Sequence, residues 1–229
     1  MKWSKLPNKP SEFPQLWLAR VEEASEQKEQ SCRRLLSASE YKRYKLIKFP
    51  LKQRQYLLSR WLIRHALSAT YNQPMDFWDI EERVGKFPVI HNLPPQTYLS
   101  LSHSNDNVLF AISNLAIGVD IEKVSKRKNI AEMAELFMTP DELDLFHKQA
   151  RSESYFYKTW CLKEAYFKSL PSAEQQNISL RKIDTSKIRS ENSNQLIINT
   201  HSIKYALAIY SEKNLNAKGL SSKLVTFLR

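Results

Sequence analysis

Two carboxylates that stand two residues apart, Asp120 and Glu122, carry the most chemical information in this chain. They follow an apolar run that begins at Leu115 and predicts a β-strand. A strand alternates its faces, so both carboxylates point to one side while Val119 and Ile121 point to the other. Two like charges in apolar surroundings repel each other and lose hydration, and a hard divalent cation is well suited to compensate them. Taken alone, the same spacing also fits the solvated edge of a half-exposed strand.

A second group of candidate residues lies on a predicted helix over residues 153–169. Trp160, Glu164 and Lys168 recur every four residues and therefore form one stripe on that helix, with Lys163 beside it. A third carboxylate between two ammonium groups suits a site that binds a metal ion and a phosphate together. The alternative is a surface ion pair, because Glu164 and Lys168 stand in the favoured order for a contact four residues apart.

The third group is the run Ser102-His103-Ser104, which follows a predicted strand with alternating apolar residues. Two hydroxyls and an imidazole at the end of a strand can donate hydrogen bonds to phosphate oxygens. They can equally cap the turn of a hairpin. A serine hydrolase is disfavoured, because the chain has no G-x-S-x-G nucleophile elbow and the serines adjoin the histidine in sequence.

The elements that must position these groups are short strands and helices. Ser37 and Glu40 form a capping-box pattern that starts one helix, and Thr139 starts another in the same way. Residues 171–194 are polar and are predicted to form an irregular, mobile surface loop. The pattern predicts an α+β fold with mainly antiparallel sheet. The remaining predicted helices run from Ser37 to about residue 48 and over residues 53–71 and 131–137, and the predicted strands are residues 78–83, 97–102, 108–113, 117–122, 195–199, 203–210 and 223–228.

Composition places the chain among globular proteins with an affinity for polyanions. Its 229 residues include 42% hydrophobic residues, enough for one large domain or two small ones with a core. The net charge of +11 favours nucleic acid, phospholipid, nucleotide phosphates or an acidic protein as a partner, and does not choose among them. Only three glycines occur, and we expect the backbone at Gly85 and Gly118 to bend or to approach a ligand closely.

The cysteines and the apolar runs indicate where the protein works. Cys32 and Cys161 provide neither a disulfide framework nor a zinc-binding spacing. The first residues lack the apolar stretch of a signal peptide, and no apolar run approaches the ~18 residues that a membrane span needs. We therefore expect a soluble, reducing, cytoplasmic setting without a membrane partner.

Taken in order, the three groups resemble the signature motifs of the 4′-phosphopantetheinyl transferase superfamily, specifically its larger, Sfp-type branch. The matching segments are the serine-histidine strand over residues 99–104, the G-V-D-I-E strand over residues 118–122 and the W-x-x-K-E-A-x-x-K helix over residues 160–168. Each motif is loose alone, whereas the three in this order on a chain of this length form a specific signature. A fainter similarity extends upstream to a basic helix and to the run Gly85-Lys86-Phe87-Pro88.

This resemblance implies an architecture that periodicity would not show. Enzymes similar to this chain consist of two α+β halves related by a pseudo-twofold axis, with the active site between them. We accordingly expect an N-terminal half over residues 1–115, on the side of the coenzyme A 3′-phosphate and adenine. A C-terminal half over residues 116–229 would carry the metal-binding strand and the W-x-x-K-E-A-x-x-K helix. We also expect a monomer.

The resemblance also implies a function: transfer of the 4′-phosphopantetheine arm of coenzyme A to a serine of an apo acyl or peptidyl carrier protein, with release of 3′,5′-ADP. Such acidic carriers serve fatty acid, polyketide and nonribosomal peptide biosynthesis. Asp120, Glu122 and Glu164 would hold Mg²⁺, or Mn²⁺, in this site. Glu164, directly or through a metal-bound water, would take the proton of the attacking serine. The expected catalytic residues are Asp120, Glu164 and Lys168.

Several other residues are expected to hold coenzyme A. Lys163 and Lys168 would pair with the pyrophosphate, and the backbone near Gly85 would lie against the adenine. Ser102 and Ser104 would donate to phosphate oxygens. The ribose 3′-phosphate needs further cations, and the candidates for it are Lys45, Arg54, Lys86 and His103.

Two departures from the family pattern concern the edges of the site. Phe87 interrupts the usual Gly-Lys-Pro, so the adenine-side loop is expected to be displaced. Ser-Leu-Pro-Ser follows Lys168 in place of the frequent Gly-x-Gly-Leu, which alters the segment expected to contact the carrier. Two other classes of function stay open. One is a different Mg²⁺-dependent enzyme acting on another nucleotide, and the other is a nucleic-acid-binding protein, which would leave the carboxylates unexplained.

Overall fold

The computed structural model describes residues 14–21, 26–85, 87–149, 152–188, 193–200, 203–211 and 221–224. These residues fall into two compact units. As far as the chain is described, the first comprises residues 1–97, 106–114 and 219–229, and the second comprises residues 98–105 and 115–218. Both units combine helices with mainly antiparallel strands, so the predicted α+β class is confirmed. The pseudo-twofold axis and the boundary after residue 115 stay predictions.

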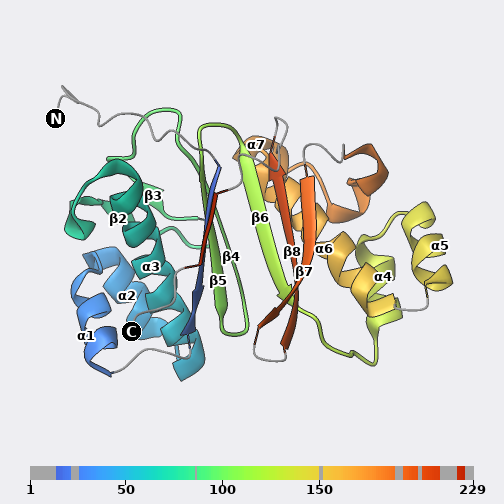
Figure 1. The fold of residues 1–229 in the computed structure, drawn as a ribbon, viewed down its shortest axis with the longest axis horizontal. Helices are drawn as coiled ribbons and strands as arrows, with labels where there is room; N and C mark the ends of the chain where they lie inside the picture. Colours follow the sequence, from blue (N-terminus) through green and yellow to red (C-terminus); the bar gives the residue numbers. More distant parts are fainter. Residues whose placement is uncertain are drawn as a thin grey trace. The chain divides into compact units, whose positions relative to one another are not determined.

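The first unit is built on a sheet in which β1 (Gln15–Arg20) pairs with strands on both sides. Its partners are β5 (Asn107–Ser113), which is antiparallel and buried throughout, and β9 (Ser221–Leu224), which is parallel. Helices α1 (Glu26–Arg34), α2 (Ala38–Leu46) and α3 (Pro50–Tyr71) lie on one side of β1 and β5 (Figure 1). The 3₁₀ turn η2 (Met75–Phe77) and the antiparallel strands β2 (Ile80–Glu81) and β3 (Val89–Ile90) complete this unit.

The helices of the first unit begin and end at residues suited to those positions. The Ser37 hydroxyl accepts from the Glu40 N–H and the Glu40 carboxylate accepts from the Ser37 N–H, so the predicted capping box is confirmed. α3 begins at Pro50, earlier than predicted, because proline suits the first helical turn, where its missing N–H has no partner to lose. Asn72 ends α3 in the left-handed conformation, with a φ of 51°. Within the described residues, no helix is long and apolar enough to cross a membrane.

The second unit is an antiparallel sheet covered by one long helix. The strands β6 (Ile117–Lys123), β8 (Ile203–Ser211) and β7 (Ser193–Thr200) follow in that spatial order, so β6 lies at an edge. The helix α6 (Ser152–Ser169) packs on β6 and β8, and β4 (Tyr98–Ser104) lies against β6. Buried side chains of α6, including Phe156 and Cys161, join Ala206 and Ala208 of β8 in the core. The remaining helices of this unit are α4 (Ile130–Phe137), α5 (Pro140–Lys148) and α7 (Ser172–Gln175).

The prediction of an irregular loop over residues 171–194 is wrong for most of its described part. It contains α7 and two 3₁₀ turns, η3 (Leu180–Lys182) and η4 (Thr185–Lys187), and Ile183 between those turns is 3% exposed. The turns also pack on α6. The polar composition concealed this order because one buried apolar side chain and backbone carbonyls, instead of a hydrophobic stripe, hold the segment in place.

Other differences are smaller and have local causes. β1 and α1 were not predicted, because β1 does not alternate in burial and Cys32 is the single buried residue among the side chains of α1 that the structure describes. Of the strand predicted over residues 78–83, only Ile80–Glu81 forms one. The predicted strand over residues 223–228 overlaps β9, and residues 225–228 lie outside the described chain.

The two glycines singled out in the sequence have different structural roles. Gly85 lies in an exposed turn with a φ of 69°, so the predicted bend is present. Gly118 in β6 lies directly under α6: a β-carbon on it would come within 1.7 Å of the Ala165 carbonyl oxygen and 2.8 Å of the Ser169 nitrogen. The close approach at Gly118 is therefore to the backbone of a helix and not to a ligand.

Gly118→Ala should destabilise the protein by about 3 kcal/mol or more, because the new methyl group meets backbone atoms that cannot move without displacing α6. Gly85→Ala is the matched control. No atom lies within 4 Å of its added β-carbon, so only the left-handed backbone opposes the change, at about 1 kcal/mol. Urea unfolding of both variants measures the difference, and equal losses would show that α6 is free to move away from β6.

Candidate functional site

The paired carboxylates lie on one face of β6, as predicted. Asp120 is only 2% exposed and Glu122 is half-buried, while Val119 and Ile121 are fully buried on the opposite face. The alternation of an extended strand therefore places two acids side by side in a protected setting. This arrangement excludes the alternative of a solvated strand edge at Asp120.

Serine side chains of β4 close the open edge of β6. At every second position of β4 a hydroxyl accepts a hydrogen bond from a backbone N–H of β6, where a paired strand would normally offer a carbonyl. The bonds run from Val119 N to Ser100 Oγ at 3.0 Å, from Ile121 N to Ser102 Oγ at 3.3 Å and from Lys123 N to Ser104 Oγ at 2.9 Å.

Two of these serines also hold the carboxylates. Ser102 Oγ donates to Asp120 Oδ1 at 2.7 Å, and Ser104 Oγ donates to Glu122 Oε2 at 2.8 Å. Both hydroxyl protons are therefore engaged by carboxylates, and not free for the phosphate oxygens that the sequence suggested. His103 lies between the two serines, on the exposed side of the strand.

The predicted stripe on α6 brings Glu164 and Lys168 to Asp120. Lys168 Nζ lies 2.6 Å from Asp120 Oδ1, 3.4 Å from Ser102 Oγ and 3.8 Å from Glu164 Oε2. Burial alone would lower the pKa of Lys168, but the Asp120 carboxylate outweighs it and the pKa is raised. Lys168 therefore stays cationic between two acids. Trp160, the first residue of the stripe, packs edge-to-face on Phe137 with ring centroids 4.9 Å apart.

The other two acids of the cluster both have raised pKa values. Burial is the main cause of the raised pKa at Glu164, where Asp120 adds to it and Lys168 opposes it. Burial also raises the pKa of Glu122, against the hydrogen bond from Ser104, and Asp120 again contributes. Asp120 thus raises the pKa of both neighbours, as expected of carboxylates gathered closely.

The carboxylates suit an open magnesium site, completed by water and substrate, better than a metal site closed entirely by protein ligands. Among the described residues, no three His, Cys, Asp or Glu side chains are already gathered as ligands of a metal ion. Mg²⁺ usually takes only one or two carboxylates and completes its shell with water and substrate phosphates. Asp120 Oδ2 is buried and accepts no hydrogen bond from an N–H or O–H group of the described chain, while the Cys161 thiol, a weak donor, interacts with the Asp120 carboxylate. Such a weakly partnered anionic oxygen suits a cation. Asp120, Glu122 and Glu164 are the residues that would hold the ion.

Lys163 is not brought to this cluster. Its side chain is fully buried, and Nζ lies 2.6 Å from Glu142 Oε2 and donates to the carbonyls of Phe137 at 2.7 Å and Leu180 at 3.2 Å. Burial lowers the pKa of Lys163, while Glu142 opposes that shift. The pyrophosphate contact of Lys163 stays a prediction. In this arrangement its ammonium is turned away from Lys168, because residues five apart on a helix point about 140° apart.

Glu142 connects Lys163 to the turns that follow α6. It closes the capping box of α5 with Thr139, and its Oε1 accepts from the N–H and the hydroxyl of Thr185 at 3.0 and 2.6 Å. Burial would raise the pKa of Glu142, but these hydrogen bonds and Lys163 outweigh it and the pKa is lowered. The ion pair therefore fixes the residue 180–187 segment onto α6.

Of the basic residues expected at the 3′-phosphate, Lys45 and Arg54 lie in the first unit and His103 lies on β4 of the second. Lys45 is exposed, with Nζ 5.7 Å from the centre of the Tyr41 ring, and Arg54 forms an ion pair with Glu29 at 2.8 Å. Gly85 lies in its exposed turn. Lys86 lies outside the described residues.

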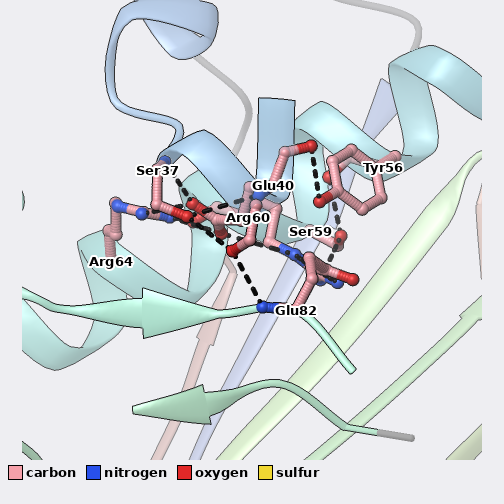
Figure 2. Close-up of polar contacts among 8 residues, drawn as sticks. Ser37, Glu40, Tyr56, Ser59, Arg60, Arg64 and Glu82 are labelled. Carbon is pink, nitrogen blue, oxygen red and sulfur yellow. Dashed lines mark hydrogen bonds and ion pairs between the residues drawn. The ribbon is translucent and has the colours of Figure 1, made fainter. Parts of the chain in front are cut away.

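A buried ionic network beneath these basic residues was missed in the sequence. Arg64 forms a bidentate ion pair with Glu40 (Figure 2): Nη1 donates to Oε1 at 3.0 Å and Nη2 donates to Oε2 at 2.6 Å. Arg60 lies 3.5 Å from Glu40 and donates to Glu82 at 2.6 Å from Nε. The network joins α2, α3 and the segment after β2, so it fixes the elements from which Lys45 and Arg54 project. The available signal was periodicity, because both arginines fall on the apolar face of the predicted helix.

Comparison with known proteins shows which family the part of the chain that carries this cluster resembles. The model of the 4′-phosphopantetheinyl transferase superfamily matches residues 116–222, which include all three candidate metal ligands and Lys168. The chain is 37% identical over 123 residues to the 4′-phosphopantetheinyl transferase psf-1 of Bacillus pumilus, covering 53% of this chain and 52% of that protein. It is 33% identical over 148 residues to the 4′-phosphopantetheinyl transferase Sfp of Bacillus subtilis, covering 62% and 61%.

A more distant relative is matched over a longer stretch. The 4′-phosphopantetheinyl transferase HetI of Nostoc is 26% identical over 166 residues, covering 68% of this chain and 69% of that protein. The chain spans about half the length of psf-1 and about three fifths of Sfp in these matches. The family resemblance read from the three motifs is confirmed.

Lys163→Met should cost about 3–5 kcal/mol of unfolding free energy, because it leaves the Glu142 carboxylate buried without its cation. Adding Glu142→Gln removes the second charge and should recover part of the loss. Urea unfolding of the single and double variants measures both effects. A Lys163→Met protein with normal stability and no activity would instead support the prediction that Lys163 contacts the pyrophosphate.

Glu164→Gln should make the metal-free protein at least as stable as the wild type at pH 7. Because the folded-state pKa of Glu164 is raised above its usual 4.5, the native state holds a proton that the unfolded state has already released. Wild-type stability therefore falls as pH rises from 4.5 through the folded pKa, and the uncharged variant escapes this loss. Denaturation between pH 4.5 and 7 should show the variant's advantage growing with pH. A variant less stable than the wild type at pH 7 would show that the ion pair with Lys168 outweighs the cost of burying the Glu164 charge.

Proposed function

We propose, since residues 116–222 belong to the 4′-phosphopantetheinyl transferase superfamily, that this protein transfers the 4′-phosphopantetheine arm of coenzyme A to a serine of an apo carrier protein. The serine oxygen forms a bond to the phosphorus next to the pantetheine, and the bond from that phosphorus to the leaving 3′,5′-ADP breaks. The observation that supports this most is the cluster of Asp120, Glu122, Glu164 and Lys168 inside the matched region.

The acids of the cluster have separate roles in this reaction. Asp120, whose Oδ2 accepts from no N–H or O–H group of the described chain, and Glu122 would be the principal ligands of Mg²⁺, or Mn²⁺, with Glu164 as the third. When bound, the ion neutralises the pyrophosphate oxygens on which charge develops. Lys168 adds a second positive charge beside Asp120 and would pair with the same pyrophosphate.

Glu164 is the residue suited to accept the serine proton. Its pKa is raised by burial, which brings a carboxylate closer to the neutral range where a general base is most effective. Lys168, 3.8 Å away, favours the ionised form that accepts the proton. Glu164 would act directly or through a water molecule.

The remaining proposed contacts hold the 3′-phosphate and the adenine of coenzyme A. Exposed Lys45, Arg54 and His103 have the charge or hydrogen-bonding capacity to hold the ribose 3′-phosphate, and the Gly85 turn would lie against the adenine with Lys86 beside it. Lys163 is left out because its ammonium is enclosed by Glu142 and two carbonyls, and the hydroxyls of Ser102 and Ser104 are assigned to the carboxylates instead.

The net charge of the chain and its family resemblance support a proposed partner and cellular location. The net charge of +11 suits an acidic acyl or peptidyl carrier protein of fatty acid, polyketide or nonribosomal peptide biosynthesis. We propose a monomer that works in the cytoplasm, with residues 1–115 on the coenzyme A side and residues 116–229 carrying the metal-binding strand.

With Mg²⁺ and coenzyme A, the protein should add the mass of phosphopantetheine to an apo carrier protein, as measured by intact mass spectrometry. Glu164→Gln should slow this conversion by ~10²–10⁴-fold, because it removes the basic oxygen while keeping size and packing. Glu153→Gln, in the first turn of the same helix, is the matched control and should leave the rate unchanged.

Failure of the well-folded wild type on each of several apo carriers would contradict the transfer reaction itself. Near-normal turnover by Glu164→Gln, with an active wild type, would contradict only the assignment of the base. Thermal protection by ATP but not by coenzyme A would favour the other class of Mg²⁺-dependent phosphate enzyme.

A further inference from the structure

The serines of β4 do more than close the edge of β6, because two of them each hold one oxygen of a carboxylate on β6. We propose that Ser104 determines which divalent cation this site accepts, by leaving Glu122 only one oxygen with which to bind it. This inference rests on the proposed function, since it concerns the same metal site, and extends it to the choice between Mg²⁺ and Ca²⁺.

The direction of the Ser104 hydroxyl proton is set by the backbone. A serine hydroxyl has one proton to donate and two lone pairs that accept. The N–H of Lys123 donates to Ser104 Oγ at 2.9 Å, so one lone pair is engaged from the strand side. The proton is directed to Glu122 Oε2 at 2.8 Å. Ser104 therefore grips the main chain and the carboxylate of one strand together.

Asp120 shows the same restriction in a stronger form. Its Oδ1 accepts from Ser102 at 2.7 Å and from Lys168 at 2.6 Å, while its buried Oδ2 accepts from no N–H or O–H group of the described chain. Each of the paired acids thus has one oxygen held by a serine of β4. Each is left with one oxygen for a cation.

One-oxygen binding favours magnesium over calcium. Mg²⁺ requires a near-ideal octahedron with short bonds, and it keeps several water ligands, so single carboxylate oxygens suit it. Ca²⁺ takes six to eight oxygens at longer distances and gains from a carboxylate that binds through both oxygens. A glutamate whose second oxygen is held by a hydroxyl loses that mode of binding.

β4 provides a matched control for this effect. Ser100 makes the same kind of bond as Ser104, accepting from the N–H of Val119 at 3.0 Å, and it is similarly buried. No hydrogen bond joins Ser100 to Asp120 or Glu122 in the described structure. Ser100→Ala therefore removes a strand-edge contact without releasing a carboxylate, whereas Ser104→Ala removes both.

The test measures cation binding without any reaction. Free Mn²⁺, measured by electron paramagnetic resonance, is titrated with the full-length protein and then displaced by Mg²⁺ or by Ca²⁺. Ser104→Ala should weaken Mg²⁺ binding by ~10-fold, as loss of an outer-shell partner typically does, and should weaken Ca²⁺ binding less. The affinity ratio of Mg²⁺ to Ca²⁺ should fall by at least roughly threefold. Ser104→Thr, which keeps the hydroxyl, should restore the wild-type ratio, and Ser100→Ala should leave it unchanged.

The outcomes separate this inference from the proposed function. A wild type that binds no Mn²⁺ would overturn the metal site and the inference together. A wild type that binds Mn²⁺, with an unchanged ratio in Ser104→Ala, would overturn the inference alone. Equal changes of the ratio in Ser104→Ala and Ser100→Ala would also overturn it, because the cause would then be the strand edge and not the carboxylate.

Discussion

The edge of β6 is closed by side chains where a sheet would ordinarily continue with backbone. An edge strand exposes unpaired N–H groups that need partners when they are buried. Here serine hydroxyls at every second position of β4 provide them, and two of these hydroxyls donate onward to Asp120 and Glu122. Strand position and carboxylate orientation therefore depend on the same hydrogen bonds. The other wall of the site, α6, is placed against this strand through the contact at Gly118.

Much of this site could be predicted because it depends on local periodicity. The strand alternation of residues 118–122 and the four-residue spacing of Glu164 and Lys168 each determine a face, and both faces occur as predicted. The helix starts at Ser37 and Thr139 could be predicted for the same reason, because a capping box needs only residues three apart. The family motifs then linked segments that periodicity treats separately.

The rest depends on partners distant in sequence. Helical spacing places Lys163 beside the stripe that contains Lys168, but only the presence of Glu142 and the Leu180 carbonyl shows that Lys163 has a structural position. Likewise, Glu40 could be recognised as a capping residue, but its ion pair with Arg64 joins residues 24 positions apart. The hydroxyls of Ser102 and Ser104 were expected to face a phosphate because the strand that receives them could not be identified from sequence.

The contact between Gly118 and Ala165 also affects how this scaffold tolerates substitutions. It joins main chain to main chain, so the spacing of β6 and α6 is limited by peptide atoms that every sequence shares. Substitutions among the neighbouring core side chains, such as Cys161 or Phe156, can alter packing without bringing the strand and helix closer. A protein engineer could therefore replace core side chains with smaller ones without β6 and α6 collapsing onto each other, provided that residue 118 stays glycine.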